Sequence, residues 1–120
     1  MIGLGTRTVL VIGAASILLA GFGLVRPATA QLGNISFPTS GAPAAQPAFL
    51  EGVKDLHSFQ FDEAVVAFQK AEAIDRNFAM AYWGEAMSHN HPLWAEVDVP
   101  GAKRALEKLG ATVEERAAKA

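Results

Sequence analysis

Phe49-Leu-Glu-Gly-Val-Lys-Asp-Leu-His57 and Trp83-Gly-Glu-Ala-Met-Ser-His-Asn-His91 align as two copies of one segment, at an offset of 34 in the numbering (83 − 49). Two of the aligned pairs are identical and three keep size or character. They are Phe49 with Trp83, Glu51 with Glu85, Gly52 with Ala86, Val53 with Met87, and His57 with His91. An offset of this length is typical of helical repeats. The sequence therefore predicts a repeated helical unit over residues 49–94.

The stretch between the two copies has the period of a helix. In Asp62-Glu-Ala-Val-Val-Ala-Phe-Gln-Lys-Ala-Glu-Ala-Ile-Asp75, three residues are spaced to share one helical face, and they are Ala64, Phe68 and Ala71. The pattern predicts a first helix from about residue 47, a second over 62–75, and a third over 78–90 that ends before Pro92.

Two further helices are predicted near the carboxyl end. Asp98 is placed to cap a fourth helix, with Pro100 in its first turn and Gly110 at its end. Thr112-x-x-Glu115 is a capping box and indicates that another helix follows.

The central residues resemble the tetratricopeptide repeat, whose pattern is W-x2-L-G-x2-Y, then A-x3-F, then P. Gly52 matches the glycine, and Ala64 with Phe68 matches A-x3-F. Several positions depart from the pattern, namely Ala48, Glu51 and Asp55 at the Trp, Leu and Tyr places, Arg76 at the Pro place, and Tyr82 and Ala86 at the Trp and Gly places of the second copy.

The segment 79–94 also resembles a run found in exported bacterial proteins that carry these repeats. The resemblance covers about half the chain. It implies an all-α fold of antiparallel helix pairs over residues 47–120, incomplete at the carboxyl end. It also implies a protein-binding scaffold.

The amino-terminal residues have the features of an export signal. Arg7 precedes an uncharged run from Thr8 to Val25, and Ala28-Thr-Ala30 supplies the small residues that a signal peptidase needs. We therefore expect a signal peptide over 1–30 and a periplasmic or secreted protein. The alternative is an inner-membrane anchor formed by residues 8–25, because a run of this length is at the short edge of what spans a bilayer.

Composition narrows the range of partners. The formal net charge is −2, and it becomes −4 without residues 1–30, which hold Arg7 and Arg26. This balance argues against a nucleic-acid partner, which needs clustered Lys and Arg. The absence of cysteine excludes disulfides and thiolate metal sites. Residues 31–46 are rich in Ala, Pro, Gly and Ser and are uncharged, which predicts a flexible linker.

The partner-binding groove is predicted from matched places in the two copies. Val53 and His57 in the first copy, with Met87 and His91 in the second, are expected to line one side of the stack. The alternative is a metal-binding or enzymatic protein that uses His57 and His91. A tight zinc site needs three or four ligands, and His89 points away from His91 on a regular helix. We therefore expect no metal site.

The remaining recurrent residues are assigned to packing or to solvent. Repeat packing is predicted for Phe49, Gly52, Ala64, Phe68, Ala71, Tyr82, Trp83 and Ala86. Trp83 or Trp94 is an alternative place for ligand stacking, and Glu51 and Glu85 are expected on a solvated face. No phosphate loop, nucleophile elbow or catalytic triad is present, so we expect no catalytic residue and no cofactor. The predicted function is a non-catalytic scaffold that binds a protein or peptide partner, and a membrane-anchored structural component is a further alternative.

Overall fold

The first helix pair follows the predicted pattern closely. The computed structural model describes residues 32–120, in which α1 spans Gln46–His57 and α2 spans Phe61–Ile74. Pro47 occupies the first turn of α1, where its missing N–H costs no hydrogen bond. Asp62 and Glu63 lie in the first turn of α2, where carboxylates favour the positive end of the helix dipole.

The second helix pair consists of α3, Ala79–Ser88, and α4, Val99–Leu109. Asp98 caps α4 as predicted, and its Oδ1 accepts a hydrogen bond from the Gly101 N–H at 2.9 Å. The short α5, Val113–Ala117, begins at the predicted capping box of Thr112 and Glu115, which is confirmed.

The connection between α3 and α4 contains a small antiparallel strand pair that the sequence pattern does not predict. Strands β1, Asn90–His91, and β2, Glu96–Val97, flank the 3-10 turn η1, Pro92–Trp94. Asn90 pairs with Val97, and His91 pairs with Glu96. The third helix therefore ends at Ser88 rather than at residue 90, and His91 lies outside it.

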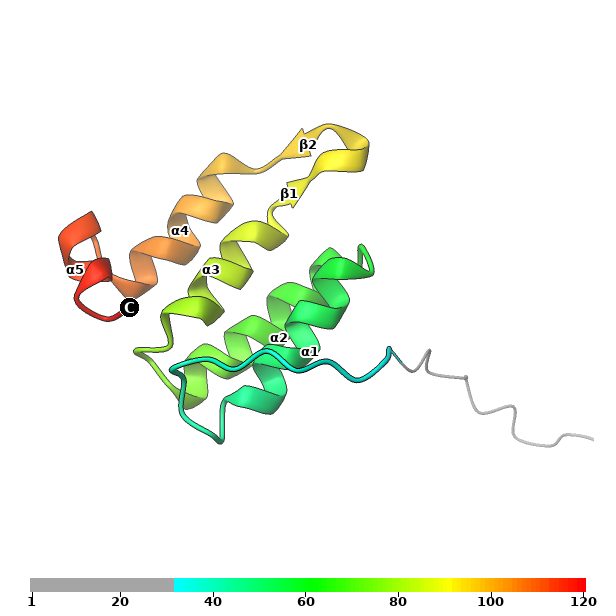
Figure 1. The fold of residues 1–120 in the computed structure, drawn as a ribbon. Helices are drawn as coiled ribbons and strands as arrows, with labels where there is room; N and C mark the ends of the chain where they lie inside the picture. The colour runs from blue at the N-terminus through cyan, green and yellow to red at the C-terminus, as the bar shows by residue number, and fades with distance from the viewer. Residues whose placement is uncertain (1–31) are drawn as a thin grey trace, which may run out of the picture. The chain divides into compact units, whose positions relative to one another are not determined.

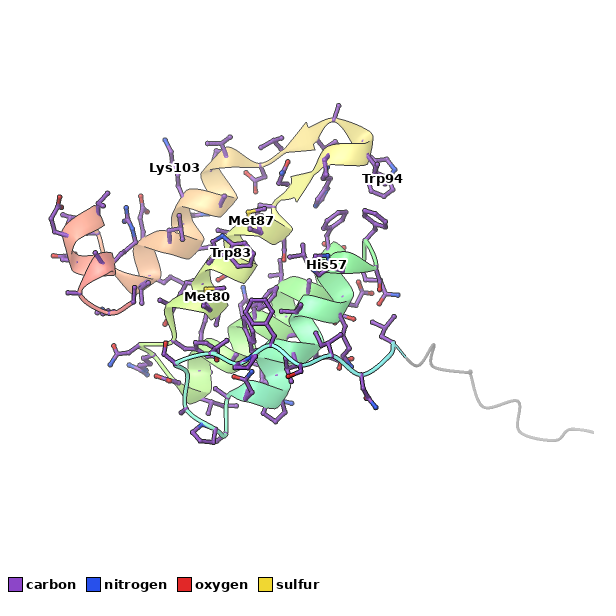
Figure 2. The ribbon with its side chains drawn as sticks, viewed as in Figure 1. His57, Met80, Trp83, Met87, Trp94 and Lys103 are labelled. Carbon is purple, nitrogen blue, oxygen red and sulfur yellow. The ribbon has the colours of Figure 1, made fainter. Side chains whose placement is uncertain are left out.

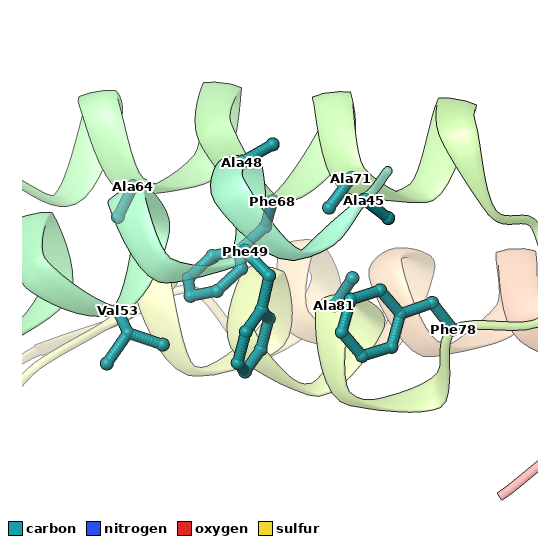
Figure 3. Close-up of a cluster of buried hydrophobic side chains, with 9 residues drawn as sticks. All are labelled: Ala45, Ala48, Phe49, Val53, Ala64, Phe68, Ala71, Phe78 and Ala81. Carbon is teal, nitrogen blue, oxygen red and sulfur yellow. The ribbon is translucent and has the colours of Figure 1, made fainter. Parts of the chain in front are cut away.

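The helices form an antiparallel array (Figure 1), in which each of α1 to α4 contacts the next and α1 also contacts α3. The core is built from three phenylalanine rings that are surrounded by smaller side chains, mostly alanine (Figure 3). The centroid of the Phe49 ring lies 5.8 Å from that of Phe68 and 5.0 Å from that of Phe78. Gly52 and Gly84 approach the ring of Phe68 so closely that a Cβ at either position would overlap it.

Residues 35–43, which we call the strap, differ from the predicted flexible linker. The strap runs along α1, with the Phe37 ring 5.5 Å from the Phe49 ring. The Gln46 side chain holds it by two hydrogen bonds, because its Nε2 donates to the Phe37 carbonyl and its Oε1 accepts from Thr39 Oγ1, each at 2.6 Å. Gly41 lies against the Phe78 ring with no room for a side chain. Small residues thus allow this uncharged segment to pack closely on the helices.

The strap is also fastened beyond α1. The Ala42 N–H donates to Asp75 Oδ2 at 2.8 Å, at the end of α2. Ala45, which follows the strap in the chain, is fully buried in the core. The strap and the helices accordingly belong to one compact unit.

The first helices of the two pairs, α1 and α3, are related by an offset of 33 in the numbering rather than by the offset of 34 that the sequence alignment indicates. An offset of 33 places buried positions on buried positions, and the pairs are Ala45 with Phe78, Ala48 with Ala81, Phe49 with Tyr82, Gly52 with Glu85, and Asp55 with Ser88. An offset of 34 pairs buried Phe49 with Trp83, which is 44% exposed. The offset of 34 fails because a shift of one residue rotates a position by about 100° around the helix axis, which turns a buried position towards the surface.

The prediction of a mainly helical fold is confirmed. Within the described residues, no helix is both long enough and apolar enough to cross a bilayer. The predicted signal peptide over 1–30, and the alternative anchor over 8–25, lie outside those residues.

Candidate interaction surface

The α3 stripe consists of Met80, Trp83 and Met87, which follow one another along one side of the helix (Figure 2). Trp83 is 44% exposed and Met87 is 38% exposed, whereas Met80 is half-buried against the core. The single charged residue of α3, Glu85, is buried. The helix therefore presents an apolar line of side chains without any charge of its own.

The predicted groove residues do not share one surface. His57 is exposed at the end of α1 and Met87 is exposed on α3, but Val53 is buried. His91 lies in β1, where its ring stacks on the Phe61 ring at a centroid distance of 4.2 Å. The offset of 33 places Asn90, not His91, at the position equivalent to His57.

Each ring nitrogen of His91 faces an oxygen atom, and the tautomer decides which of the two receives a hydrogen bond. Its Nε2 lies 3.1 Å from the Ser88 carbonyl oxygen, and its Nδ1 lies 3.4 Å from Glu96 Oε2. His89 is also paired, with its Nδ1 at 3.4 Å from Asp98 Oδ2. In residues 32–120, no group of three or more His, Asp or Glu side chains is arranged to hold a metal ion.

A second exposed apolar surface, the aromatic tip, is missed by the sequence reasoning. Its rings are Phe59, Phe61 and Trp94, whose centroids lie 5.9–6.2 Å apart in edge-to-face pairs. Phe59 and Trp94 are each more than half exposed. Phe59 has a φ of 62°, which is unfavourable for a bulky residue. Helical periodicity in the sequence does not reveal this cluster, because Phe59 lies in a turn, Phe61 at the start of α2 and Trp94 in η1.

Two buried carboxyl groups and the partly exposed Lys108 form a cluster that joins three helices. Lys108 Nζ on α4 donates to Glu72 Oε2 on α2 at 2.7 Å and also to Glu85 Oε2 on α3. Gln69 Nε2 donates to Glu85 Oε1 at 2.8 Å. Glu72 is only 6% exposed and Glu85 only 5%, so the prediction of a solvated face fails for Glu85, although it holds for exposed Glu51.

The pKa values of the two carboxyl groups of this cluster are shifted in opposite directions. Burial raises the pKa of Glu72 to about 8, and the neighbouring Glu85 adds to the effect. Burial also acts to raise the pKa of Glu85, but hydrogen bonds from Glu72, Gln69 and Lys108 bring that pKa below its usual value. Glu72 Oε1 has no hydrogen-bond partner in the described structure, and a neutral carboxyl tolerates this better than an ionised one.

The predicted packing residues divide into two groups. Six are buried as expected, namely Phe49, Gly52, Ala64, Phe68, Ala71 and Tyr82. Trp83 is exposed and Ala86 is half-buried, which differs from the prediction. Both differences follow from the alignment error of one residue, since the core-facing residue of α3 is Tyr82 and its neighbour Trp83 points away.

No known family, curated protein or solved structure matches the chain.

Proposed function

We propose that the protein is a non-catalytic, tetratricopeptide-like scaffold that binds a protein partner outside the cytoplasm. Three features support the repeat assignment. Helices α1 to α4 form two antiparallel pairs, α1 contacts α3, and an offset of 33 matches the buried positions of α1 to those of α3. Export, with cleavage after Ala30, rests on the sequence of residues 1–30.

The observation that carries the proposal is the uncovered α3 stripe. Large apolar side chains that stay exposed on a helix, in a line and without charged neighbours on that helix, are typical of a surface that buries itself against a partner. Trp83 is the residue best suited to anchor such a contact, because tryptophan is enriched among residues that dominate binding energy. Met87, one turn further along, offers a flexible side chain that adapts to different shapes.

Site-specific photo-crosslinking in the cells that make the protein tests this proposal. A photoreactive phenylalanine analogue replaces Trp83 in one strain and Val66 in another. Val66 is a matched control because it is apolar, lies on α2 and is 67% exposed. We expect a discrete protein adduct from position 83 and none from position 66. Equal labelling at both positions, or no adduct at position 83, would refute the proposed function.

A further inference from the structure

In the part of the chain that the structure describes, α1 and α2 alone line an open cavity of about 640 Å³. A cavity of this volume is large enough to hold a whole small molecule. Part of its lining is apolar and the rest is charged. The apolar residues are Pro47, Ala48, Val66 and Ala67, and the charged residues are Glu51, Asp55, Asp62, Glu63 and Lys70. Because the carboxyl groups outnumber the single lysine, the cavity has an excess of negative charge.

Asp55 is the residue of this cavity that packing does not explain. Only 6% of its surface is exposed, yet within residues 32–120 its carboxyl group accepts no hydrogen bond and forms no ion pair. The neighbouring Lys54 is paired with Glu51 instead, with its Nζ 2.5 Å from Glu51 Oε2. Burial raises the pKa of Asp55, and repulsion from Glu51 and Glu63 adds to the rise, which Lys54 partly offsets. An ionised carboxylate at this position therefore costs the fold stability.

The equivalent residue of α3 shows that the helix pair does not need an acid at this place. With the offset of 33, Asp55 corresponds to Ser88, which is also buried. The Ser88 hydroxyl donates to the Gly84 carbonyl of its own helix at 2.9 Å, so its polar group is satisfied within the fold. An ionised carboxylate has no proton to donate and cannot make this bond. The partner that suits Asp55 is a donor that enters through the cavity.

The surroundings of Asp55 favour an organic cation over a metal ion. Within the described residues, no three carboxylate or histidine side chains are arranged to hold a metal ion. The apolar part of the lining, in contrast, offers a surface on which an alkyl chain is buried. An alkylammonium ion supplies both a charged donor for Asp55 and an apolar body for Ala48 and Ala67.

We propose that the cavity between α1 and α2 is a binding site for a small aliphatic amine. The ammonium group donates to the Asp55 carboxylate, and the nearby carboxylates of Glu51 and Glu63 add attraction. The alkyl chain packs on the apolar residues of the lining. This site is separate from the α3 stripe and does not depend on the proposed function. Because charge contributes to the recognition, the affinity decreases as the salt concentration rises.

The probe is n-pentylamine, and two matched compounds separate the contributions of its parts. The alcohol n-pentanol has the alkyl chain without the charge, and the ammonium ion has the charge without the chain. Binding to the purified, isotope-labelled protein is followed through the NMR signals of the backbone amides of α1 and α2. We expect saturable binding of n-pentylamine at neutral pH, and binding of either matched compound that is at least about tenfold weaker.

Variants of the protein locate the amine and test whether Asp55 has a purely structural role. Asp55→Asn keeps the shape of the side chain but removes its charge, so it should weaken binding at least about tenfold. The same change should leave the melting temperature unchanged or raise it, because it removes the repulsion from Glu51 and Glu63. Glu107→Gln is the matched control and should not alter binding, because Glu107 is exposed on α4 and lies outside the cavity.

Several results would overturn the inference. Equal binding of n-pentanol, no saturable binding of n-pentylamine, or binding that survives Asp55→Asn would show that the carboxylate does not recognise an amine. A lower melting temperature of Asp55→Asn would give the carboxylate a structural role. Tighter binding of a lysine with acetylated and amidated ends, which models a side chain of a partner protein, would assign the cavity to a protein rather than to a small amine.

Discussion

Gly84→Ala should destabilise the protein although alanine is the better helix former. Gly84 lies inside α3, and a Cβ placed there would lie within 2.6 Å of three carbons of the Phe68 ring. Distances below 3.0 Å require one of the groups to move. The ring has little freedom to retreat, because a Cβ at Gly52 on α1 would also lie 2.8 Å from it and Phe68 is fully buried.

The expected magnitude follows from two opposing contributions. Replacing glycine with alanine inside a helix stabilises it by about 1 kcal/mol. Forcing an extra methyl group into a well-packed core costs about 1–3 kcal/mol. Since the Phe68 ring is enclosed, we take the upper end of that range, which gives a net loss of about 2 kcal/mol. For a folded unit of this size, such a loss lowers the melting temperature by roughly 10 °C.

A double-mutant cycle in urea measures this effect. Gly84→Ala is compared in the natural chain and in a Phe68→Leu chain, where the smaller side chain leaves room for the methyl group. We expect the penalty to fall to zero or to become a gain of up to about 1 kcal/mol in the second background, so that the two sites are coupled by about 2–3 kcal/mol. An unchanged melting temperature for Gly84→Ala, or the same penalty in both backgrounds, would refute the proposed packing of Phe68.

Three further predictions concern the ion cluster, the strap and a helix cap. The free energy of unfolding should decrease as pH rises from 4.5 to about 8, because folded Glu72 keeps a proton that the unfolded chain has released. Urea titrations at several pH values measure this slope, and Glu72→Gln should flatten it. A slope that persists in Glu72→Gln would assign the effect to other groups. Phe37→Ala should lower the free energy of unfolding by about 1–2 kcal/mol, because the ring is 40% exposed and its remaining surface is buried on α1. A loss below about 0.5 kcal/mol in thermal melts would show a loosely attached strap. Asp98→Ala should cost about 1 kcal/mol through the lost cap of α4, whereas Asp98→Asn should cost little, and equal losses in circular dichroism melts would contradict a capping role.

The helices are predictable because their signals are local. The period of Ala64, Phe68 and Ala71, the cap at Asp98 and the capping box at Thr112 each depend on residues within one or two turns, and the structure confirms them. The α3 stripe is only partly predictable. The sequence places Met87 on the surface correctly, but it assigns Trp83 to packing because the alignment matches Trp83 to Phe49.

The alignment error shows why similarity of residues does not determine which face is buried. The identical pairs at the offset of 34 are glutamates and histidines, and these residue types carry little information about burial. Glu85 is buried because Lys108, on the next helix, compensates its charge. A partner so distant in sequence leaves no periodic signal near the glutamate. The strap is held in place by contacts with residues outside it, namely Gln46, Phe49 and Asp75, and its own composition gives no sign of these contacts.

The attachment of the strap has a consequence for the order in which the chain folds. The hydrogen bond from Ala42 to Asp75 and the contact of Gly41 with Phe78 join segments that are far apart in the chain, whereas the α1 and α2 pair is linked by a short turn. Contacts between near neighbours form first, because closing a longer loop has a higher entropic cost. The end of the strap at Gly41 and Ala42 therefore docks only after α1, α2 and the start of α3 have assembled. Phe37, in contrast, contacts Gln46 and Phe49, which are near it in the chain, so it docks as soon as α1 has formed. The strap thus closes onto the fold from Phe37 towards Gly41.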